Sequence, residues 1–512
     1  MVLLLFTLLG FALRLPLLHR FPLREDEAIY GYWALHGWLV DPLFLQVWPD
    51  KPPVFLWLLG LAFHLFGHAP VTADAAARFV NIVAGTLTIP VLAVTARRWW
   101  GDAAAIVAAL LAALNPFAIS FGPTAFTDPV LVAAGSLALA LAARRRFFWA
   151  GLWLGMAIMT KQQGILFIPL VVGAWAAGFR EGGGLPGSPP LVRDALRLLA
   201  GLAVALFPVL TWDSLRWAVA PSPWELGAIN AGGVVPLPPD AWPARVAGWG
   251  QLAWYLLASP FAWGAYALAL GAALRRPGGR GGLPAAVLAT WAAVFLLLHT
   301  VIGIQVWDRY LLPLTIPLVL LGGWAAGGAS RKPAPAAQPP LLAFALLLLA
   351  LLLSPAWQAA QGQLPVGGDH GDYAGLNETL AAVNRPDSLL FHRELGWHAH
   401  FALFDAVRSG DVQLRYYPSS VYLADAATKS PHKQRFVIIP DWSPMPDLPM
   451  QLAMRGMQAE TVLRAGLFAV YRIDERRAGA ASWRVCALPQ AGPFVVQSTL
   501  DVSVCRETPP ER

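Results

Sequence analysis

Charge is the scarcest property of this sequence. Only 13% of the 512 residues are Asp, Glu, Lys or Arg, whereas 57% are hydrophobic and the mean hydropathy is +0.54. Soluble domains carry about twice that fraction of charge. The composition therefore excludes an ordinary soluble enzyme and predicts a polytopic α-helical membrane protein.

Cysteines and nucleotide-binding motifs are also scarce. The only two cysteines, Cys486 and Cys505, lie near the C-terminus, where export to an oxidising compartment would permit a disulfide. The chain has no P-loop and no glycine-rich fingerprint after a strand, which argues against a soluble nucleotide donor. Its net charge of +7 comes largely from short loops, and so predicts membrane topology and no nucleic-acid partner.

Apolar runs long enough to cross a hydrocarbon core of about 30 Å recur up to residue 357. The run at 54–67 is too short, and we expect an interfacial helix there. The first run starts without a basic region or a cleavage site, so we expect a retained helix. We predict about eleven spans, near 1–19, 76–96, 103–121, 129–143, 147–161, 164–179, 195–215, 246–270, 284–306, 311–328 and 340–357.

Arginine and lysine occupy every second connection between these runs, which predicts that those loops are cytoplasmic. They are Arg97-Arg98, Arg144–Arg146, Arg180 with Arg193 and Arg197, Arg275-Arg276 with Arg280, and Arg331-Lys332. An odd number of spans then places residues 358–512 outside. We expect a membrane domain at 1–357, with a first outer loop at 20–75, and a small α/β extracytoplasmic domain at 358–512.

This topology brings scattered ionisable residues to one outer face of an inner or plasma membrane. They are Asp26, Glu27, Asp50, Lys51, Asp128, Lys161, Asp308 and Arg309. A transporter would more often carry such groups in the middle of its spans. The pattern favours one extracytoplasmic site that handles a charged membrane substrate.

Each candidate has a structural alternative. Asp26 and Glu27 precede an expected amphipathic helix and could complement its dipole, or one could be a general base, for which we favour Asp26. Lys51, before two prolines, could snorkel to the headgroups or hold a lipid phosphate. Asp50 could pair with that lysine or bind a divalent metal.

Similar alternatives apply further along the chain. Asp128 precedes a proline, the usual arrangement for an N-cap, so capping competes with a catalytic or metal-binding role. Lys161 and Arg309 each lie beside an expected span. Either residue could anchor the chain in an aromatic belt or contact the same phosphate.

The joint order of six motifs resembles the GT-C membrane glycosyltransferases, and more narrowly the bacterial relatives of protein O-mannosyltransferases and aminoarabinose transferases. The likeness covers about residues 1–330. The motifs are DEAIY at Asp26–Tyr30, DKPP at Asp50–Pro53, Arg78, TDP at Thr127–Pro129, TKQQG at Thr160–Gly164 and DRYLLP at Asp308–Pro313.

The resemblance implies transfer of a sugar from a polyprenyl-phosphate carrier to a protein, lipid or glycan acceptor at the outer face, with inversion. It implies that Asp26 is the base and that Lys51, Lys161 and Arg309 contact the donor phosphate. Asp50 matches an acid linked to a metal in some relatives. Asp128 matches the second outer-loop acid but lacks the acidic neighbour that some relatives have, which weakens the case for a divalent metal.

Two rival functions remain open. A flippase for a lipid-linked sugar would share the basic residues but would not need Asp26 for proton transfer. A polyprenyl-dependent polysaccharide ligase or polymerase would use a similar carrier but leave a different lipid product. In the C-terminal region we expect strands at Ser388–Phe391, Arg435–Ile439, Glu460–Leu463 and Phe468–Arg472, with helices between them.

Overall fold

The computed structural model describes residues 1–181, 189–275, 282–327, 338–367, 371–432, 434–475, 483–487 and 503–506. Contacts divide the chain into two compact units. The membrane unit consists of Met1–Arg20, Trp33–His68 and Thr72–His370, and the C-terminal unit consists of Phe21–Tyr32, Ala69–Val71 and Gly371–Arg512. Parts of the predicted cytoplasmic loops, including Arg276, Arg280, Arg331 and Lys332, lie outside the described residues.

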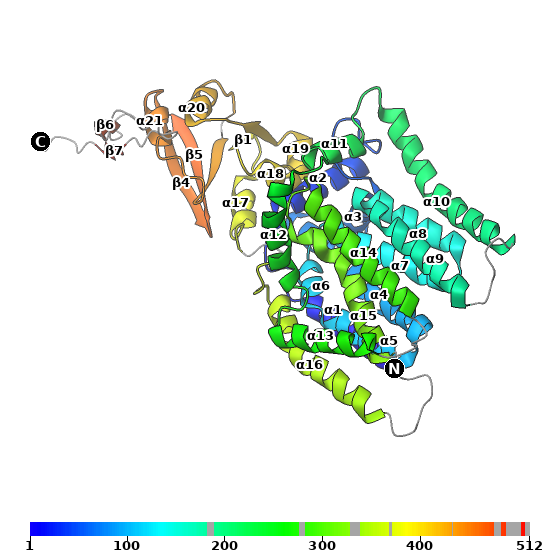
Figure 1. Ribbon diagram of the computed structural model, residues 1–512. Coiled ribbons are helices and arrows are strands. Elements are labelled where there is room, and N and C mark those ends of the chain that lie inside the picture. The colour runs from blue at the N-terminus through cyan, green and yellow to red at the C-terminus, as the bar shows by residue number, and fades with distance from the viewer. Residues whose placement is uncertain are drawn as a thin grey trace, which may run out of the picture. The chain divides into compact units, whose positions relative to one another are not determined.

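The membrane unit is helical (Figure 1). Its elements are α1 (Val2–Arg14), α2 (Glu25–Leu39, whose first half belongs to the C-terminal unit), α3 (Val54–Phe66), α4 (Pro70–Trp100), α5 (Asp102–Leu114), α6 (Pro116–Phe121), α7 (Asp128–Ala143), α8 (Phe147–Thr160), η1 (Gln162–Leu166), α9 (Phe167–Glu181), α10 (Pro189–Arg216), α11 (Pro223–Asn230), η2 (Pro239–Ala241), α12 (Trp242–Trp254), α13 (Pro260–Leu274), α14 (Gly282–Val301), η3 (Asp308–Leu314), α15 (Thr315–Gly327) and α16 (Gln338–Ala360).

Among the described residues, four helical stretches are long and apolar enough to cross a membrane: Thr72–Trp100, Val192–Arg216, Gly282–Val301 and Asp308–Gly327. Several shorter apolar helices accompany them. A helix forms in nearly every predicted span and in the predicted interfacial segment, where α3 begins after Pro53. The number of spans and their orientation stay predictions.

Two predicted spans are each divided into two helices. The stretch at 246–270 is two helices, α12 and α13, separated at Tyr255–Ser259. Ser259 explains the break, because its hydroxyl accepts a hydrogen bond from the Ala262 N–H while Pro260 fills the first turn of α13. The predicted span at 103–121 is divided in the same way by Asn115, which caps α6.

Close packing between α8 and α10 depends on glycine. The two helices lie side by side (Figure 1). A Cβ atom added to Gly151 would lie 1.9 Å from the Leu198 carbonyl oxygen, and one added to Gly201 would lie 1.8 Å from that of Phe148. Small residues at both positions therefore let the two backbones approach closely.

The C-terminal unit contains a five-stranded mixed sheet with the order β2-β1-β3-β5-β4. Strand β1 pairs in parallel with β2 and β3, whereas β5 is antiparallel to β3 and β4. The four predicted strands are confirmed, whereas β2, β6 and β7 were not predicted. The elements of the C-terminal unit are α17 (Leu376–Val383), β1 (Ser388–His392), α18 (Gly396–Ala402), α19 (Phe404–Ser409), β2 (Val412–Tyr416), α20 (Ser420–Thr428), β3 (Gln434–Pro440), α21 (Leu448–Ala453), β4 (Met457–Ala465), β5 (Phe468–Glu475), β6 (Trp483–Ala487) and β7 (Ser503–Arg506).

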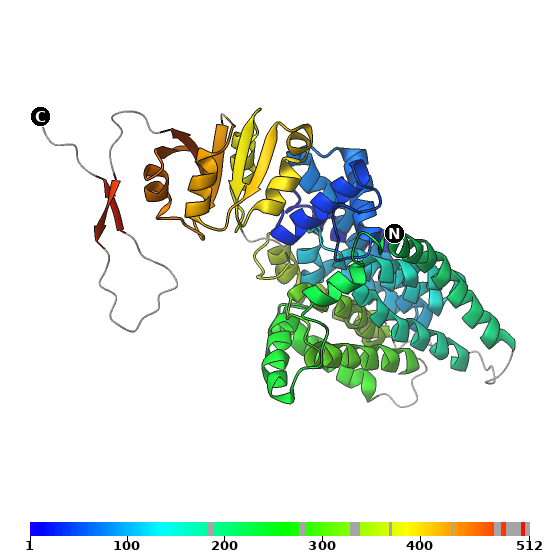
Figure 2. The ribbon, with the colours of Figure 1, turned by 90° about the horizontal axis from the view of Figure 1, so that it is seen from above.

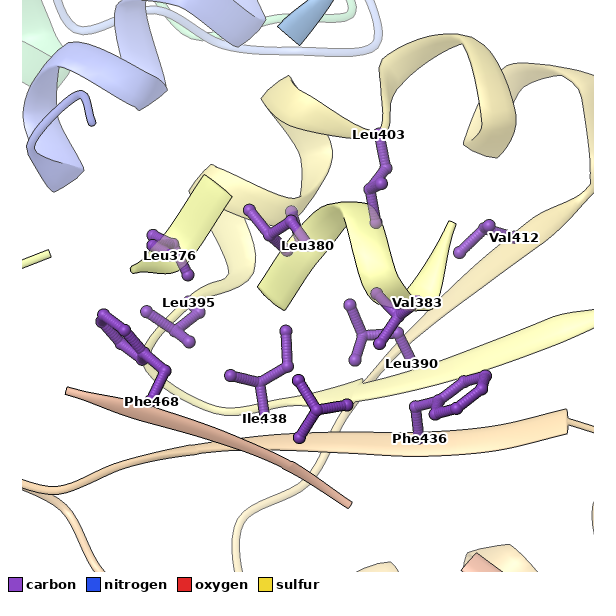
Figure 3. Close-up of a cluster of buried hydrophobic side chains, with 12 residues drawn as sticks. Leu376, Leu380, Val383, Leu390, Leu395, Leu403, Val412, Phe436, Ile438 and Phe468 are labelled. Atoms are coloured by element: carbon purple, nitrogen blue, oxygen red, sulfur yellow. The ribbon is translucent and has the colours of Figure 1, made fainter. Parts of the chain in front are cut away.

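Alternate residues of the sheet enter two separate cores. On one face Leu390, Phe436 and Ile438 pack against α17 and α18 (Figure 3). On the other face Leu389, Phe391 and Val437 pack against α20 and α21. Helices therefore cover both sides of the sheet (Figure 2). Cys486 in β6 and Cys505 in β7 belong to a separate two-stranded ribbon, and their disulfide stays a prediction.

Candidate active site

A buried ion pair joins two of the predicted site residues in the membrane unit. The Lys161 ammonium lies 2.5 Å from Oδ1 of Asp128, and their side chains are only 7% and 1% exposed. Helix α7 begins at Asp128, and Thr127 occupies its N-cap position. The Asp128 carboxylate therefore does not fill the N-cap position that was one alternative for it, and it accepts a hydrogen bond from Lys161. Removing either partner would leave an uncompensated buried charge.

The surroundings of Lys161 lower the pKa of its ammonium group. The residue lies in the turn after α8, and its Nζ stands 4.3 Å from the centre of the Tyr310 ring. Burial lowers the pKa of Lys161 to about 8; the Asp128 charge opposes this effect, and the positive charges of Arg309 and Lys51 add to it. The positive charges of Arg309 and Lys51 therefore lie close enough to act on Lys161.

Lys51 lies in a second, less buried pair. Its Nζ is 2.5 Å from Oδ2 of Asp50, and the same carboxylate oxygen accepts a hydrogen bond from Asn230 at the end of α11. The Gln162 side-chain amide donates to the backbone oxygens of Asp50 and Pro223, at 2.8 and 2.9 Å. The Lys51 loop is thus fixed to both α11 and the turn that carries Lys161.

Lys51 and Lys161 line one pocket of about 350 Å³. Its walls are mostly apolar and come from η1, α11, α14 and the segment leading to η3. Beside the lysines the lining residues are Gln162, Gln163, Ile165, Leu166, Trp224, Gly227, Ala228, Ala231, Val234, Leu298, His299, Ile302, Ile304 and Tyr310. Two lysines thus line a pocket whose other walls are mostly apolar.

A second pocket of about 350 Å³ adjoins the first, since Leu166 and Leu298 line both. It runs between α9 and α14, and its remaining lining is almost wholly apolar: Pro169, Gly173, Leu283, Ala286, Val287, Thr290, Trp291, Val294 and Phe295. The two pockets thus adjoin at these leucines, and two lysines line the first whereas the second is almost wholly apolar. We call the two adjoining pockets together the donor groove.

The polar side of the groove has defined donors and acceptors. The Gln163 amide nitrogen lies 3.2 Å from the Tyr310 carbonyl oxygen and 3.0 Å from Nε2 of His299. Because a carbonyl only accepts, this amide nitrogen is the donor, and Nε2 of His299 accepts. The His299 proton then lies on Nδ1, which donates to the Phe295 oxygen at 2.8 Å.

Arg309 stands near these residues but does not line the pocket. Its guanidinium stacks over the Phe126 ring, 4.7 Å from the ring centre. The neighbouring Asp308 has a structural task, because its carboxylate accepts the backbone N–H groups of Arg309 and Gly367, at 2.7 and 2.9 Å. The membrane unit therefore brings Lys51, Lys161, Asp50 and Asp128 close to Arg309.

The two predicted catalytic acids belong to the C-terminal unit, in the first turn of α2. Glu27 is 1% exposed, and its carboxylate accepts the Arg24 N–H at 2.8 Å, as the glutamate of a capping box does. Asp26 is half-buried. Partial burial, and then the charges of Asp26 and Glu394, raise the pKa of the nearby Glu25. Glu27 thus has a structural role that the sequence alternatives only partly anticipated.

The described residues do not fit a divalent metal at Asp50 and Asp128. Each carboxylate already binds a lysine ammonium, and no group of three His, Cys, Asp or Glu side chains gathers in the described ranges. A divalent site needs several oxygen ligands whose charge is available. The predicted metal role therefore finds no support in this donor set.

Several pocket residues, and Asn230 beside Asp50, had no predicted role. Gln162, Gln163 and Tyr310 were quoted only as parts of motifs, and His299, Asn230 and Trp224 were not considered as site residues. They lie on helix ends far apart in the sequence, so only the tertiary fold brings them together. The one signal available was the polar pair Gln162-Gln163 between two apolar runs.

Comparison with known proteins shows what this chain is similar to. A family model described as dolichyl-phosphate-mannose-protein mannosyltransferase matches residues 50–212. The crystal structure of ArnT from Cupriavidus metallidurans bound to undecaprenyl phosphate aligns with a TM-score of 0.61 and 17% identity over 92% of this chain and 97% of that chain. Its apo form gives 0.60 and 18% over the same shares. No curated protein matches the sequence.

A more distant match is the apo oligosaccharyltransferase of Archaeoglobus fulgidus, with a TM-score of 0.48 and 13% identity over 88% of this chain and 72% of that chain. The family model over residues 50–212 and the fold shared with ArnT agree with the resemblance to the GT-C membrane glycosyltransferases that the motifs indicate.

Proposed function

We propose that this protein transfers a sugar from a polyprenyl-phosphate donor to an acceptor hydroxyl at the outer face of the inner or plasma membrane, with inversion at the anomeric carbon. The observation that carries the proposal is the donor groove. Its cationic end suits a lipid phosphate and its apolar end suits an isoprenoid chain. The solved structure of ArnT with undecaprenyl phosphate supports the same class of ligand.

In the proposed reaction the acceptor oxygen forms a bond to the anomeric carbon as the bond from that carbon to the phosphate oxygen breaks. Negative charge grows on the departing polyprenyl phosphate. Lys51 and Lys161, with Arg309 nearby, stabilise that charge. Asp26 takes the proton of the acceptor hydroxyl. No step in this scheme needs a metal.

The paired aspartates have a positioning role in this scheme. Asp128 fixes Lys161 at 2.5 Å, and Asp50, itself held by Asn230, fixes Lys51. Both cations are thereby oriented before the donor arrives, which reduces the entropy lost on binding. They act through the lysines and do not touch the donor.

The test is binding of undecaprenyl phosphate to the purified protein. Lys51→Met and Lys161→Met should each weaken binding about 10- to 100-fold, because a hydrogen bond to a charged group contributes about 1.5–3 kcal/mol. Lys429→Met, at an exposed lysine of the C-terminal unit, is the control and should bind like wild type. Unchanged binding by both lysine variants would contradict the assignment of the cationic end.

The apolar end can be tested separately. Ala286 lines the second pocket, and Ala286→Phe would partly fill it. This variant should weaken binding of a long polyprenyl phosphate but leave a short-chain isoprenyl phosphate unaffected. Equal weakening for both chain lengths would contradict the proposed course of the lipid tail.

The two rivals predict other products. A flippase would move the intact lipid-linked sugar and release no polyprenyl phosphate. A ligase or polymerase acting on a diphosphate carrier would release polyprenyl diphosphate. The mass of the lipid product therefore separates the three functions.

A further inference from the structure

A second, unrelated cation is buried deep in the membrane unit. Arg14, the last residue of α1, is 1% exposed. Its Nη1 donates to the Gly10 oxygen at 2.6 Å, and its Nη2 reaches the Ala112 oxygen at the long distance of 3.5 Å. Its Nε is buried and has no hydrogen-bond partner among the described residues.

Within the described ranges, no carboxylate forms an ion pair with Arg14, unlike Lys51, Lys161 and Arg216. A guanidinium keeps its charge in proteins. An uncompensated charge inside a membrane helix bundle costs several kcal/mol and calls for a partner. The Ala112 carbonyl, in the last turn of α5, offers only the partial negative charge of a helix end.

The fold makes room for this side chain. Gly10, Gly85 and Gly122 come from three separate parts of the bundle, and a Cβ atom added to each would approach Arg14. The nearest Arg14 atoms would be Nη1 at 3.1 Å, Nε at 3.2 Å and Cγ at 2.7 Å, respectively. The guanidinium therefore occupies a cradle that three glycines keep open.

A small cavity of about 30 Å³ lies against Arg14. Polar side chains of Thr88, Asn115 and Thr315 share its lining with apolar ones. About 10–15 Å³ is enough for one water molecule, so the cavity has room for a single small ion but not for a phosphate ester. The unsatisfied guanidinium and the cavity are thus in direct contact.

We propose that this cavity binds one small monovalent anion of chloride size, which neutralises Arg14 and ties α1 to α4 and α15. The ion would accept hydrogen bonds from the guanidinium, and the Asn115 and threonine side chains would line it. This site is separate from the donor groove, with which it shares no lining residue. The inference does not depend on the proposed transferase activity.

The test is equilibrium binding of radioactive chloride to the full-length protein in detergent, in a gluconate buffer of constant ionic strength. Wild type should bind one chloride per chain saturably, and bromide should compete. Gly85→Ala, whose added Cβ would contact only Arg14, should weaken chloride binding at least about tenfold by displacing the guanidinium. Gly264→Ala, where a Cβ would meet nothing within 4 Å, should bind chloride like wild type.

A second measurement keeps the inference testable if Gly85→Ala fails to fold. The thermal unfolding midpoint of wild type should rise when chloride or bromide replaces gluconate, because a ligand that binds only the native state stabilises it. Arg14→Met removes the charge together with its counter-ion, and its midpoint should not depend on chloride. Absence of saturable chloride binding by wild type would overturn the proposal. Arg14 would then have only backbone carbonyl groups and water as hydrogen-bond partners.

Discussion

At the scale of single residues, Lys161 pairs with Asp128 and Lys51 pairs with Asp50. These pairs distinguish the roles of the acids. Asp128 and Asp50 orient lysines, Asp308 holds backbone N–H groups, and Glu27 caps a helix. Asp26 stays the proposed general base on the strength of the motif resemblance, and the catalytic proposal rests on that assignment.

Asp128→Asn should shift the alkaline limb of the pH profile. Lysine binds phosphate in its charged form, so donor binding should fall as the pH rises through the Lys161 pKa of about 8. The Asp128 charge raises that pKa, so its loss lowers the pKa further and moves the limb to lower pH. The profile of kcat/KM for the donor, from about pH 6 to 9.5, measures this shift.

Chelation of the wild-type protein tests the alternative in which Asp128 binds a divalent metal. If Asp128 bound a divalent cation required for activity, chelation would abolish wild-type activity and added metal would restore it. Under the present account, chelation has no effect on wild type. An unshifted alkaline limb in Asp128→Asn would contradict the coupling of Asp128 to Lys161.

Glu27 and Asp26 can be separated by their amides. Glu27→Gln keeps an oxygen that can accept the Arg24 N–H, so stability and activity should both stay close to wild type. Glu27→Ala removes the bond and should cost about 1 kcal/mol of stability. Thermal unfolding and initial rates measure the two effects. Loss of activity in a stable Glu27→Gln protein would make Glu27 the base instead.

At the scale of helices and strands, the sequence predicted which elements exist more accurately than where each one begins and ends. Hydropathy locates apolar helices because each must bury its own backbone hydrogen bonds in the membrane. It missed the division of 246–270 because Ser259-Pro260 caps α13 inside an apolar run. Strand β2 was missed because it lies at the edge of the sheet, where most of its side chains are exposed and its pattern is weakly apolar.

Gly201→Ala tests the contact between α8 and α10. The new methyl group would meet the Phe148 carbonyl at 1.8 Å, so the helices must separate, at a cost of about 1–3 kcal/mol. The thermal unfolding midpoint of the detergent-solubilised protein should fall. Gly264→Ala, on an open helix surface, should leave the midpoint unchanged or raise it slightly, since alanine favours helix. Equal midpoints for the two variants would contradict the close packing.

At the scale of the whole molecule, the order of short motifs predicted the resemblance with which the family model and the shared fold agree. The roles of the basic site residues stay predictions. The groove itself could not be predicted. Leu166 and Leu298 join its two ends, yet they are ordinary leucines in apolar helices. The pairing of Lys161 with Asp128 spans 33 positions and likewise depends on the tertiary fold.

The most direct test of the central claim is release of free polyprenyl phosphate by the purified protein. It would be supplied with membrane lipid, several polyprenyl-phosphate sugars and an acceptor extract. Wild type should release polyprenyl phosphate with at least one donor, and Asp26→Asn should do so at least about a hundredfold more slowly, the scale of a lost general base. No release by wild type with any donor, or equal release by Asp26→Asn, would contradict the transferase or the assignment of its base.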